Sequence, residues 1–243
     1  PKDGGRGTIE APLLPHVPIT RPALGDAEVD AVARVVRSGW VMQGPQVAAF
    51  EQEFAATVGA PHAVAVSSGT GALELALRLC DVGPGDEVIT VSHSFIATAN
   101  AVRAVGATPV FVDVDAETYG LDPSALANAW SPRTRAIMPV HQLGFPCAIA
   151  RIVAFAQEHG LAVVEDAACA VGTELAPGER IGRPHGRFAC FSFHPRKVVT
   201  TGDGGMITTD DAALAARARA LRSHGMSLPP EVRQRDPAAR ESY

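Results

Sequence analysis

Short apolar runs alternate with segments of helical periodicity from about residue 60 onwards, and this alternation constrains the fold more than any other feature. Each run of Val, Ile and Ala ends in a turn containing Gly, Pro or Asp, and the segment that follows carries apolar residues at helical spacing. Strands joined through helices in this way predict a mostly parallel sheet. The runs do not alternate apolar with polar residues, as expected where helices cover both faces. We therefore predict an α/β fold, a three-layer sandwich with a mostly parallel central sheet.

The pattern also predicts where the elements lie. The expected strands are residues 63–66, 87–91, 108–112, 136–140, 162–165, 189–193 and 205–209, and the expected helices between them are residues 72–79, 97–105, 123–129, 149–159 and 212–223. Before the sheet we expect a Pro-rich arm over residues 12–22, a helix over 26–37, a Gly-rich bend over 38–45 and a helix over 50–58. Residues 228–243 are charged and contain three prolines, so a loop is expected there. The predicted division is an N-terminal arm, residues 1–25, and one large domain, residues 26–243.

Charge, hydropathy and cysteine spacing bear on the classes of partner. The 21 basic and 26 acidic residues are mixed along the chain, so no basic stripe is available and we expect no nucleic-acid partner. No window approaches the roughly 18 apolar residues of a membrane span, and the polar start has no signal-peptide core, so we expect a cytoplasmic protein without membrane contact. The four cysteines form no C-x-x-C pair, which predicts buried free thiols and neither a metal site nor a disulfide framework.

A strand followed by Ser67-Ser-Gly-Thr-Gly71 and a helix start has the pattern of a phosphate cup. Glycines let the backbone approach an anion, the helix N-terminus favours negative charge, and Thr70 adds a hydroxyl donor. Ser and Thr also cap helices for structural reasons alone, so both interpretations of Thr70 and Gly71 remain open.

Two later residues stand at the ends of predicted buried strands. Asp166 leaves the strand Val163-Val-Glu at the edge where open α/β sheets bind ligands, and it could hold a protonated ring nitrogen, bind a metal or cap the next segment. Lys197 lies between two predicted buried strands, just before a turn rich in Thr and Gly. A lone lysine is usually a solvated surface charge, but burial favours the neutral amine that Schiff-base chemistry requires.

These motifs occur in an order that resembles a known family. The ordered set SSGT, GPGDEVI, SFIATANAV, GATPVFVDVD, PRTRAIMPVH, VVEDAACA, FSFHPRK and TTGDGGM is similar to the DegT/DnrJ-type nucleotide-sugar aminotransferases, which are fold-type I pyridoxal-phosphate enzymes. The resemblance extends from about Ile19 to Gly225. It implies that the predicted sandwich is the large, pyridoxal-phosphate-binding domain of such an enzyme.

The resemblance implies a role for each candidate residue. Lys197 resembles the catalytic lysine that holds the cofactor as a Schiff base and moves protons, and Asp166 resembles the carboxylate that keeps the pyridine nitrogen protonated. Thr70, Gly71 and Ser192 match the residues that bind the cofactor phosphate. Phe95 matches the aromatic residue that stacks on the cofactor ring, although periodicity alone is equally consistent with a core Phe.

The sequence departs from the family pattern in two respects. Cys169 stands where relatives usually have Gln or His to contact the phenolic oxygen of the cofactor, and a thiol is a weak donor. Family members also continue into a small C-terminal domain, which contributes an Asn to the phosphate site of a dimer partner, and this small domain is not expected within the present chain. The cofactor site of the chain is therefore expected to be incomplete by itself.

The implied reaction is transamination. Relatives that remove a sugar hydroxyl carry His at the position of Lys197, so the lysine favours amino transfer over dehydration. We expect a homodimer that moves an amino group from L-glutamate, through the pyridoxamine phosphate form of the cofactor, to a keto sugar nucleotide. The alternatives are a cyclitol ketone or an aminobenzoate precursor as acceptor, and a non-catalytic relative that binds the cofactor as a regulatory module. Trp40, His141 and Gln142 are candidates to line the acceptor pocket, or are structural residues.

Overall fold

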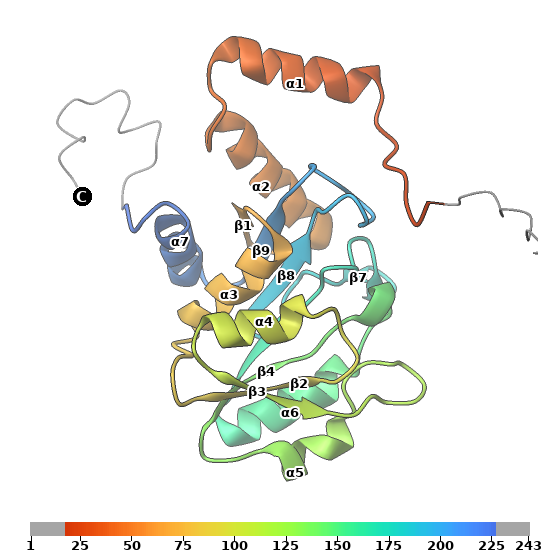
Figure 1. Ribbon diagram of the computed structural model, residues 1–243, viewed down its shortest axis with the longest axis vertical. Helices are drawn as coiled ribbons and strands as arrows, with labels where there is room; N and C mark the ends of the chain where they lie inside the picture. The colour runs from red at the N-terminus through yellow and green to blue at the C-terminus, as the bar shows by residue number, and fades with distance from the viewer. Residues whose placement is uncertain (1–17, 227–243) are drawn as a thin grey trace, which may run out of the picture.

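The computed structural model of the protein describes residues 18–226. Its centre is a seven-stranded sheet with the strand order β1-β9-β8-β5-β4-β2-β3 (Figure 1). The strands of this sheet are β1 (His62–Val66), β2 (Glu87–Val91), β3 (Thr108–Val112), β4 (Thr134–Met138), β5 (Ala162–Asp166), β8 (Phe188–Ser192) and β9 (Gly205–Thr209). The neighbours from β3 to β8 are parallel, whereas β9 is antiparallel to both β8 and β1. The mostly parallel sheet predicted from the sequence is confirmed.

Helices cover both faces of the sheet. One face packs against α3 (Gly69–Leu79), α4 (Ala97–Ala104) and α7 (Ala212–Leu221), and the other against α2 (Pro45–Val58), α5 (Leu126–Ala129) and α6 (Ile149–His159). Successive residues of a strand belong to opposite layers of the core, because side chains alternate between the two faces. In β8, Phe188 and Cys190 join the cluster beneath α3, while Ala189 and Phe191 join the cluster beneath α2. The structure is therefore the predicted three-layer sandwich.

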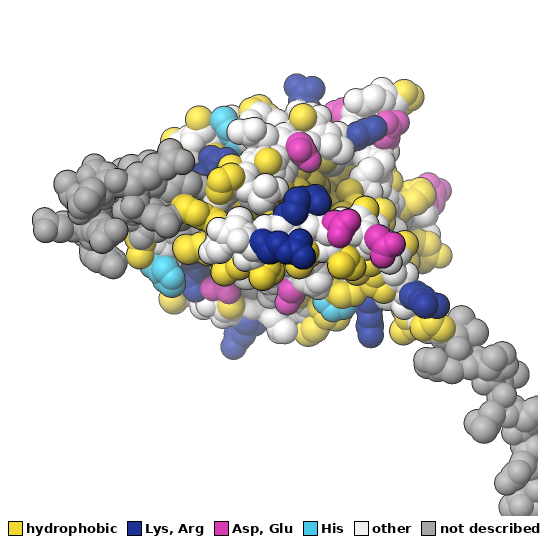
Figure 2. Space-filling model, turned by 90° about the horizontal axis from the view of Figure 1, so that it is seen from above, with side chains coloured by type: hydrophobic (Ala, Val, Ile, Leu, Met, Phe, Trp, Pro, Cys, Tyr) yellow, Lys and Arg dark blue, Asp and Glu magenta, His cyan; other side chains and the backbone are white. Residues whose placement is uncertain are grey.

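The helix α1 (Asp26–Ser38) extends away from this body beyond α2 (Figure 1). It begins after Gly25, whose N–H donates to Glu28, and it ends at Gly39 in the left-handed conformation. None of its residues is buried. Seen from the α1 end, the surface carries hydrophobic side chains between basic and acidic ones (Figure 2).

Several predicted boundaries were wrong, each for a local reason. The second helix begins at Pro45 instead of residue 50, because proline suits the first helical turn. The helix predicted over residues 123–129 is divided into a 3₁₀ turn (Pro123–Ala125) and the single turn of α5. The strand predicted over residues 136–140 spans Thr134–Met138. A small hairpin of β6 (Glu174–Ala176) and β7 (Glu179–Arg180) was not predicted, since its strands are short and polar.

The predicted terminal segments lie mostly outside the described residues. Residues 1–17 of the arm and the whole loop predicted over residues 228–243 are in this group, while residues 18–25 are exposed and precede α1. Within residues 18–226, no helix has the length and hydropathy needed to cross a bilayer, and no group of three or more His, Cys, Asp or Glu side chains is arranged to hold a metal ion. All four cysteines are free thiols, but only Cys147 and Cys190 are buried. The prediction of burial was wrong for Cys80 and Cys169, which are both half-buried. Cys80 follows the last residue of α3, and Cys169 lies in the loop after β5.

Candidate active site

One edge of the sheet collects the candidate residues. Strands β2, β4, β5 and β8 are parallel neighbours and end at this edge. Strand β1 ends there too, because β1 and β8 are both antiparallel to β9 and hence parallel to each other. The register pairs Val66 with Gly205 and Gly205 with Ser192, so the loops after β1 and β8 leave the sheet side by side. On the other side of β8, Asp166 at the end of β5 pairs with Cys190. The carboxyl edge of an open α/β sheet is where such folds bind ligands.

The start of α3 forms the predicted cup. Ser68 caps the helix by accepting a hydrogen bond from the Gly71 N–H at 3.0 Å. The N–H groups of Gly69 and Thr70 have no acceptor among residues 18–226 and are therefore available to an anion. The N–H of Gly71 already donates to Ser68, so the N–H groups of Gly69 and Thr70 are the ones that remain for an anion, and the role of Gly71 stays a prediction.

Ser192 closes the cup from the end of β8. A Cβ added to Gly69 would lie 2.6 Å from the Cβ of Ser192, so only glycine allows this close approach. Ser192 itself is buried, and its hydroxyl accepts a long hydrogen bond from the N–H of His194 at 3.4 Å. The structure therefore places Ser192 against Gly69 at the start of α3, the turn that also carries Thr70 and Gly71.

Asp166 ends β5 as a buried carboxylate with two donors. Its Oδ2 accepts a hydrogen bond from the Thr98 hydroxyl at 2.8 Å, and its Oδ1 accepts one from the Ala168 N–H at 3.1 Å. The second contact is the capping role that the sequence left open as an alternative. Each carboxylate oxygen can accept about two hydrogen bonds, so the group retains capacity for another donor.

The surroundings of Asp166 favour a cation next to it. Burial raises the pKa of Asp166, while the hydrogen bonds of Thr98 and Ala168 and the charges of Lys197 and His141 oppose that rise. A protonated ring nitrogen placed at the remaining lone pairs would lower the pKa again, because an opposite charge stabilises the carboxylate. The residue therefore fits the role of holding a pyridinium.

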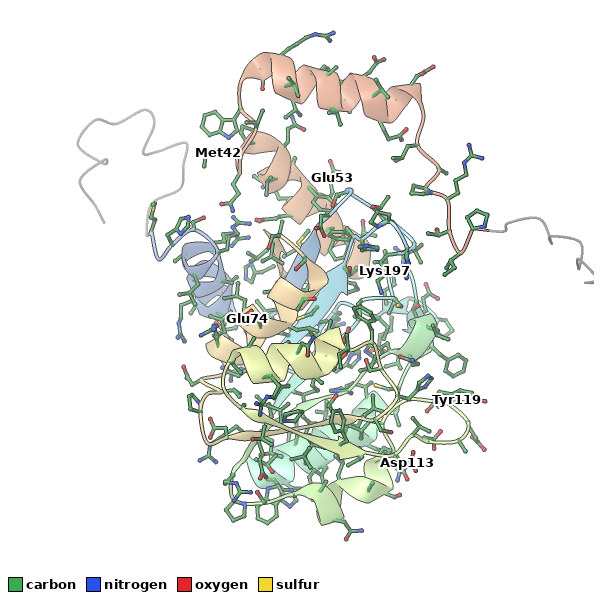
Figure 3. The ribbon with its side chains drawn as sticks, viewed as in Figure 1. Met42, Glu53, Glu74, Asp113, Tyr119 and Lys197 are labelled. Carbon is green, nitrogen blue, oxygen red and sulfur yellow. The ribbon has the colours of Figure 1, made fainter. Side chains whose placement is uncertain are left out.

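Lys197 lies on the turn between β8 and β9, at the end of the sheet towards α2 (Figure 3). Its backbone N–H donates to the carbonyl of His194 at 2.8 Å, and its Nζ lies 3.1 Å from the Sγ of Cys169. The lysine is half-buried, and the two valines that follow it are exposed. The setting is thus more open than the sequence predicted, because the turn leaves the sheet before Lys197 is reached.

Phe95 follows β2 and is 73% exposed at this edge. The alternative of an ordinary core Phe is therefore wrong. An exposed aromatic ring at a ligand-binding edge is available to stack on a flat ligand. Leu143, in the segment after β4, is also exposed, and its φ of 52° is unusual for a branched residue.

His141 is a structural residue behind the site. Its ring is buried and faces the carboxylate of Glu165, with Nε2 and Oε2 at 3.1 Å. Burial disfavours the charged ring, although hydrogen bonding and the charge of Glu165 raise the pKa of His141. The Cys147 N–H points at Nδ1, 3.3 Å away.

Glu165 connects His141 to the loop before β8. Its Oε1 accepts hydrogen bonds from the N–H groups of His185 and Gly186, at 2.7 and 3.2 Å. Burial alone would raise the pKa of Glu165, but the hydrogen bonds and charge of the two histidines hold it at about 2. This carboxylate anchors the strand that ends in Asp166.

A cavity of about 1110 Å³ adjoins the cup on the side of the α1–α2 bend. Trp40, Ser67, Gly71 and Arg222 are among its lining residues, whereas Lys197, Asp166 and Phe95 are not. Of the predicted pocket residues, Trp40 lines this cavity and donates from its indole to the carbonyl of Gln43 at 2.8 Å. The chemistry is therefore assigned to the edge that carries Lys197 and not to this cavity.

Sequence reasoning missed Thr98 and Ser94. The Ser94 and Thr98 hydroxyls lie 2.6 Å apart, and Thr98 in turn contacts Asp166. The i, i+4 spacing of two hydroxyl residues after a strand was a usable signal, because such residues are neighbours on a helical turn. Their link to Asp166 spans 68 positions in the sequence and had no local signal.

Comparisons with known proteins agree with this geometry. Spore coat polysaccharide biosynthesis protein SpsC of Bacillus subtilis (strain 168) is 49% identical over 211 residues, which cover 87% of this chain and 54% of SpsC. The crystal structure of S. venezuelae DesV, in complex with a ketimine intermediate, has 47% identity and a TM-score of 0.80 over 84% of this chain and 55% of DesV. DesI, solved in the presence of its TDP-sugar product, has 42% identity and a TM-score of 0.77 over 83% of this chain and 50% of DesI.

The fold of the chain is that of the fold-type I aminotransferases. The sequence model of the DegT/DnrJ/EryC1/StrS aminotransferase family matches residues 22–236. The chain belongs to this family. It spans about half the length of the relatives that it matches.

Proposed function

We propose that the protein acts as a pyridoxal-phosphate-dependent aminotransferase that moves an amino group from L-glutamate to a keto sugar nucleotide. The observation that carries the proposal is the placement of Lys197, Asp166 and the start of α3 at one edge of the sheet. An amine, a buried carboxylate and an anion site are the three groups needed to hold this cofactor at its aldehyde, its ring nitrogen and its phosphate.

The phosphate, the ring nitrogen and the ring face of the cofactor each have candidate binding residues. The free N–H groups of Gly69 and Thr70, with the hydroxyls of Thr70 and Ser192, would hold the phosphate at the positive end of α3. Asp166 would hold the ring nitrogen in its protonated form, and Phe95 would cover one face of the ring. When bound, pyridoxal phosphate supplies an aldehyde that links to amines and a ring that accepts electrons.

Lys197 would hold the cofactor through Nζ and then serve as the base. Once released, its amine can take a proton from the substrate carbon and return it on the cofactor side, because both lie within reach of one flexible side chain. Cys169, 3.1 Å from Nζ, can accept a hydrogen bond from the lysine and orient it. The thiol is a weaker partner than the Gln or His usual in the family.

The nature of the acceptor is supported by relatives. DesI was solved with a TDP-sugar product, and SpsC is named for polysaccharide biosynthesis. Phe95, after β2, and Leu143 and Phe145, after β4, are exposed apolar side chains that an acceptor could contact. The cytoplasmic location stays a prediction from the sequence.

We also expect a homodimer. Val29, Val32 and Val36 lie on one side of α1 and are each more than 60% exposed. An apolar stripe of this kind is typical of a surface that another chain covers. Light scattering should give twice the 25.3 kDa mass of the chain, and a mass of one chain would contradict the expectation.

Two experiments test the proposed activity. Lys197→Ala should abolish amino transfer, because no other lysine is placed at this edge within residues 18–226. Retained transamination in that variant would refute the role of Lys197. The acceptor is tested by single-turnover oxidation of the pyridoxamine form with keto sugar nucleotides, free cyclitol ketones and aminobenzoate precursors. Reaction with nucleotide sugars is expected, and reaction with only the other two classes would overturn the proposed acceptor.

A further inference from the structure

A chain of hydroxyl groups leads from the loop after β2 to the carboxylate of Asp166. The Thr98 hydroxyl donates to Oδ2 at 2.8 Å, and the Ser94 hydroxyl lies 2.6 Å from that of Thr98. A hydroxyl has one proton, and the proton of Thr98 is committed to Asp166, so Ser94 must donate in the second bond. The direction of both hydrogen bonds is thereby fixed: Ser94 to Thr98 to Asp166.

We propose that Ser94 and Thr98 are positioning residues that hold Asp166 in its ionised form and in one orientation. This inference rests on the proposed function, because a fixed, ionised Asp166 matters most when it must hold a protonated ring nitrogen. Thr98 acts through Asp166 and Ser94 acts through Thr98.

The burial of these groups makes the hydroxyl donor important. Thr98 is 2% and Asp166 5% exposed, so water has little access to replace a lost hydrogen bond. A hydrogen bond to an ionised acceptor is about twice as strong as one between neutral groups. Donation by Thr98 therefore favours the carboxylate over the carboxylic acid at a position where burial favours the acid.

The same turn links Asp166 to the predicted stacking residue. The backbone N–H of Thr98 donates to the carbonyl of Phe95 at 3.1 Å, in the turn that starts α4. The Ser94 hydroxyl therefore anchors a segment that carries both Phe95 and Thr98. One short segment would thus set the plane of the ring, through Phe95, and the partner of the ring nitrogen, through Asp166.

Other charged and titratable groups also face Asp166, and the test must separate their effects. Lys197 approaches from the β8–β9 turn, His141 from the segment after β4, and Cys190 from the neighbouring strand β8. Lys197 and His141 lower the pKa of Asp166 by their charge. Substitutions of Thr98 leave all three groups in place.

The experiment compares Thr98→Val with two matched variants. Thr98→Val removes the hydroxyl and keeps the branched shape, whereas Thr98→Ser keeps the hydroxyl. Thr90→Val is the control for loss of a buried hydroxyl, because Thr90 is fully buried and donates to the carbonyl of Met138 at 2.8 Å, away from Asp166.

The first measurement is a carbon NMR titration of the Asp166 carboxyl in cofactor-free protein, with the signal assigned through Asp166→Asn. The midpoint should move to higher pH in Thr98→Val and stay at the wild-type value in Thr98→Ser and Thr90→Val. An unchanged midpoint in Thr98→Val would overturn the inference. If Thr98→Val does not fold, Ser94→Ala provides the same test at a half-buried position. The titration midpoint of Asp166 should then rise by a smaller amount, and an unchanged midpoint would contradict the inference.

The second measurement is the affinity for pyridoxal phosphate. Thr98→Val should weaken binding about tenfold, the effect of losing one charge-assisted hydrogen bond, and Thr90→Val should not. Equal affinities of Thr98→Val and wild type would overturn the inference. A wild-type protein that binds no cofactor would refute the proposed function, while the NMR titration would still decide the role of Thr98.

Discussion

Replacing Gly205 with alanine is the sharpest stability test of the cup. Gly205 starts β9 and pairs with both Val66 and Ser192. A Cβ added there would lie 2.4 Å from the carbonyl oxygen of Ser68, 2.5 Å from its carbonyl carbon and 2.8 Å from the N of Gly69. All three are backbone atoms at the start of α3, so no flexible side chain can move aside.

The size of the effect follows from this crowding. Forcing an extra methyl group into a well-packed site costs about 1–3 kcal/mol. For a chain of this size, each kcal/mol lowers the melting temperature by about 2–4 °C, so Gly205→Ala should melt roughly 2–12 °C below the wild type. Because the strain displaces the start of α3, affinity for pyridoxal phosphate should fall as well.

Gly83→Ala is the matched control for Gly205→Ala. A Cβ on Gly83 would meet no heavy atom within 4 Å, and its φ lies outside the left-handed range. Gly-to-Ala changes at such sites are neutral or stabilise by about 0.4–1 kcal/mol. Differential scanning calorimetry and a cofactor titration measure both effects. If Gly205→Ala behaves like Gly83→Ala in both, the close approach of β9 to α3 is not as described.

Three further predictions concern acid stability, the helical layer and thiol reactivity. The pKa of Glu165 is lowered to about 2, so its stabilising effect is complete above the ordinary value of 4.5 and is lost as the pH falls from there towards 2. The free energy of unfolding, measured by chemical denaturation, should therefore fall more steeply between pH 4.5 and about 2 in the wild type than in Glu165→Gln. Parallel plots of this free energy against pH would contradict an ionised Glu165. Glu51 is buried and binds Arg219, Arg222 and the Ala65 N–H, which ties α2 to β1 and α7. Glu51→Ala should cost about 3–5 kcal/mol in urea unfolding, and a loss well below 1 kcal/mol would show that the ion pairs contribute little. Iodoacetamide should modify the half-buried Cys169 before Cys190, since burial raises the pKa of the Cys190 thiol, and bound cofactor should slow the reaction of Cys169. Peptide mass spectrometry decides the order, and faster labelling of Cys190 would refute it.

The sheet was predictable because its strands contain short apolar runs bounded by turn residues. The strand β2, for example, is buried along its whole length and stands out in the sequence. The hairpin of β6 and β7 was not predictable, because strands of three and two residues with charged side chains carry no periodicity. The antiparallel β9 could not be distinguished from a parallel strand either, since burial on both faces gives the same apolar run in both directions.

The site was predictable in its anchors and not in its supports. Asp166 and Lys197 could be found because they follow buried strands, where a charged residue is conspicuous. The residues that hold them could not, because Thr98 and Cys169 are ordinary in sequence and reach their partners only through the fold. Phe95 was ambiguous because periodicity does not distinguish a core aromatic ring from an exposed one at a strand end.

The attachment of pyridoxal phosphate to Lys197 is the central claim, and borohydride reduction tests it most directly. The purified protein is incubated with the cofactor, reduced, digested and analysed by mass spectrometry, with Lys197→Ala as the control. We expect a visible absorbance band that reduction abolishes and a cofactor mass on the peptide that contains Lys197 and on no other. A protein without such a band, or with the cofactor fixed to another lysine, would contradict the account.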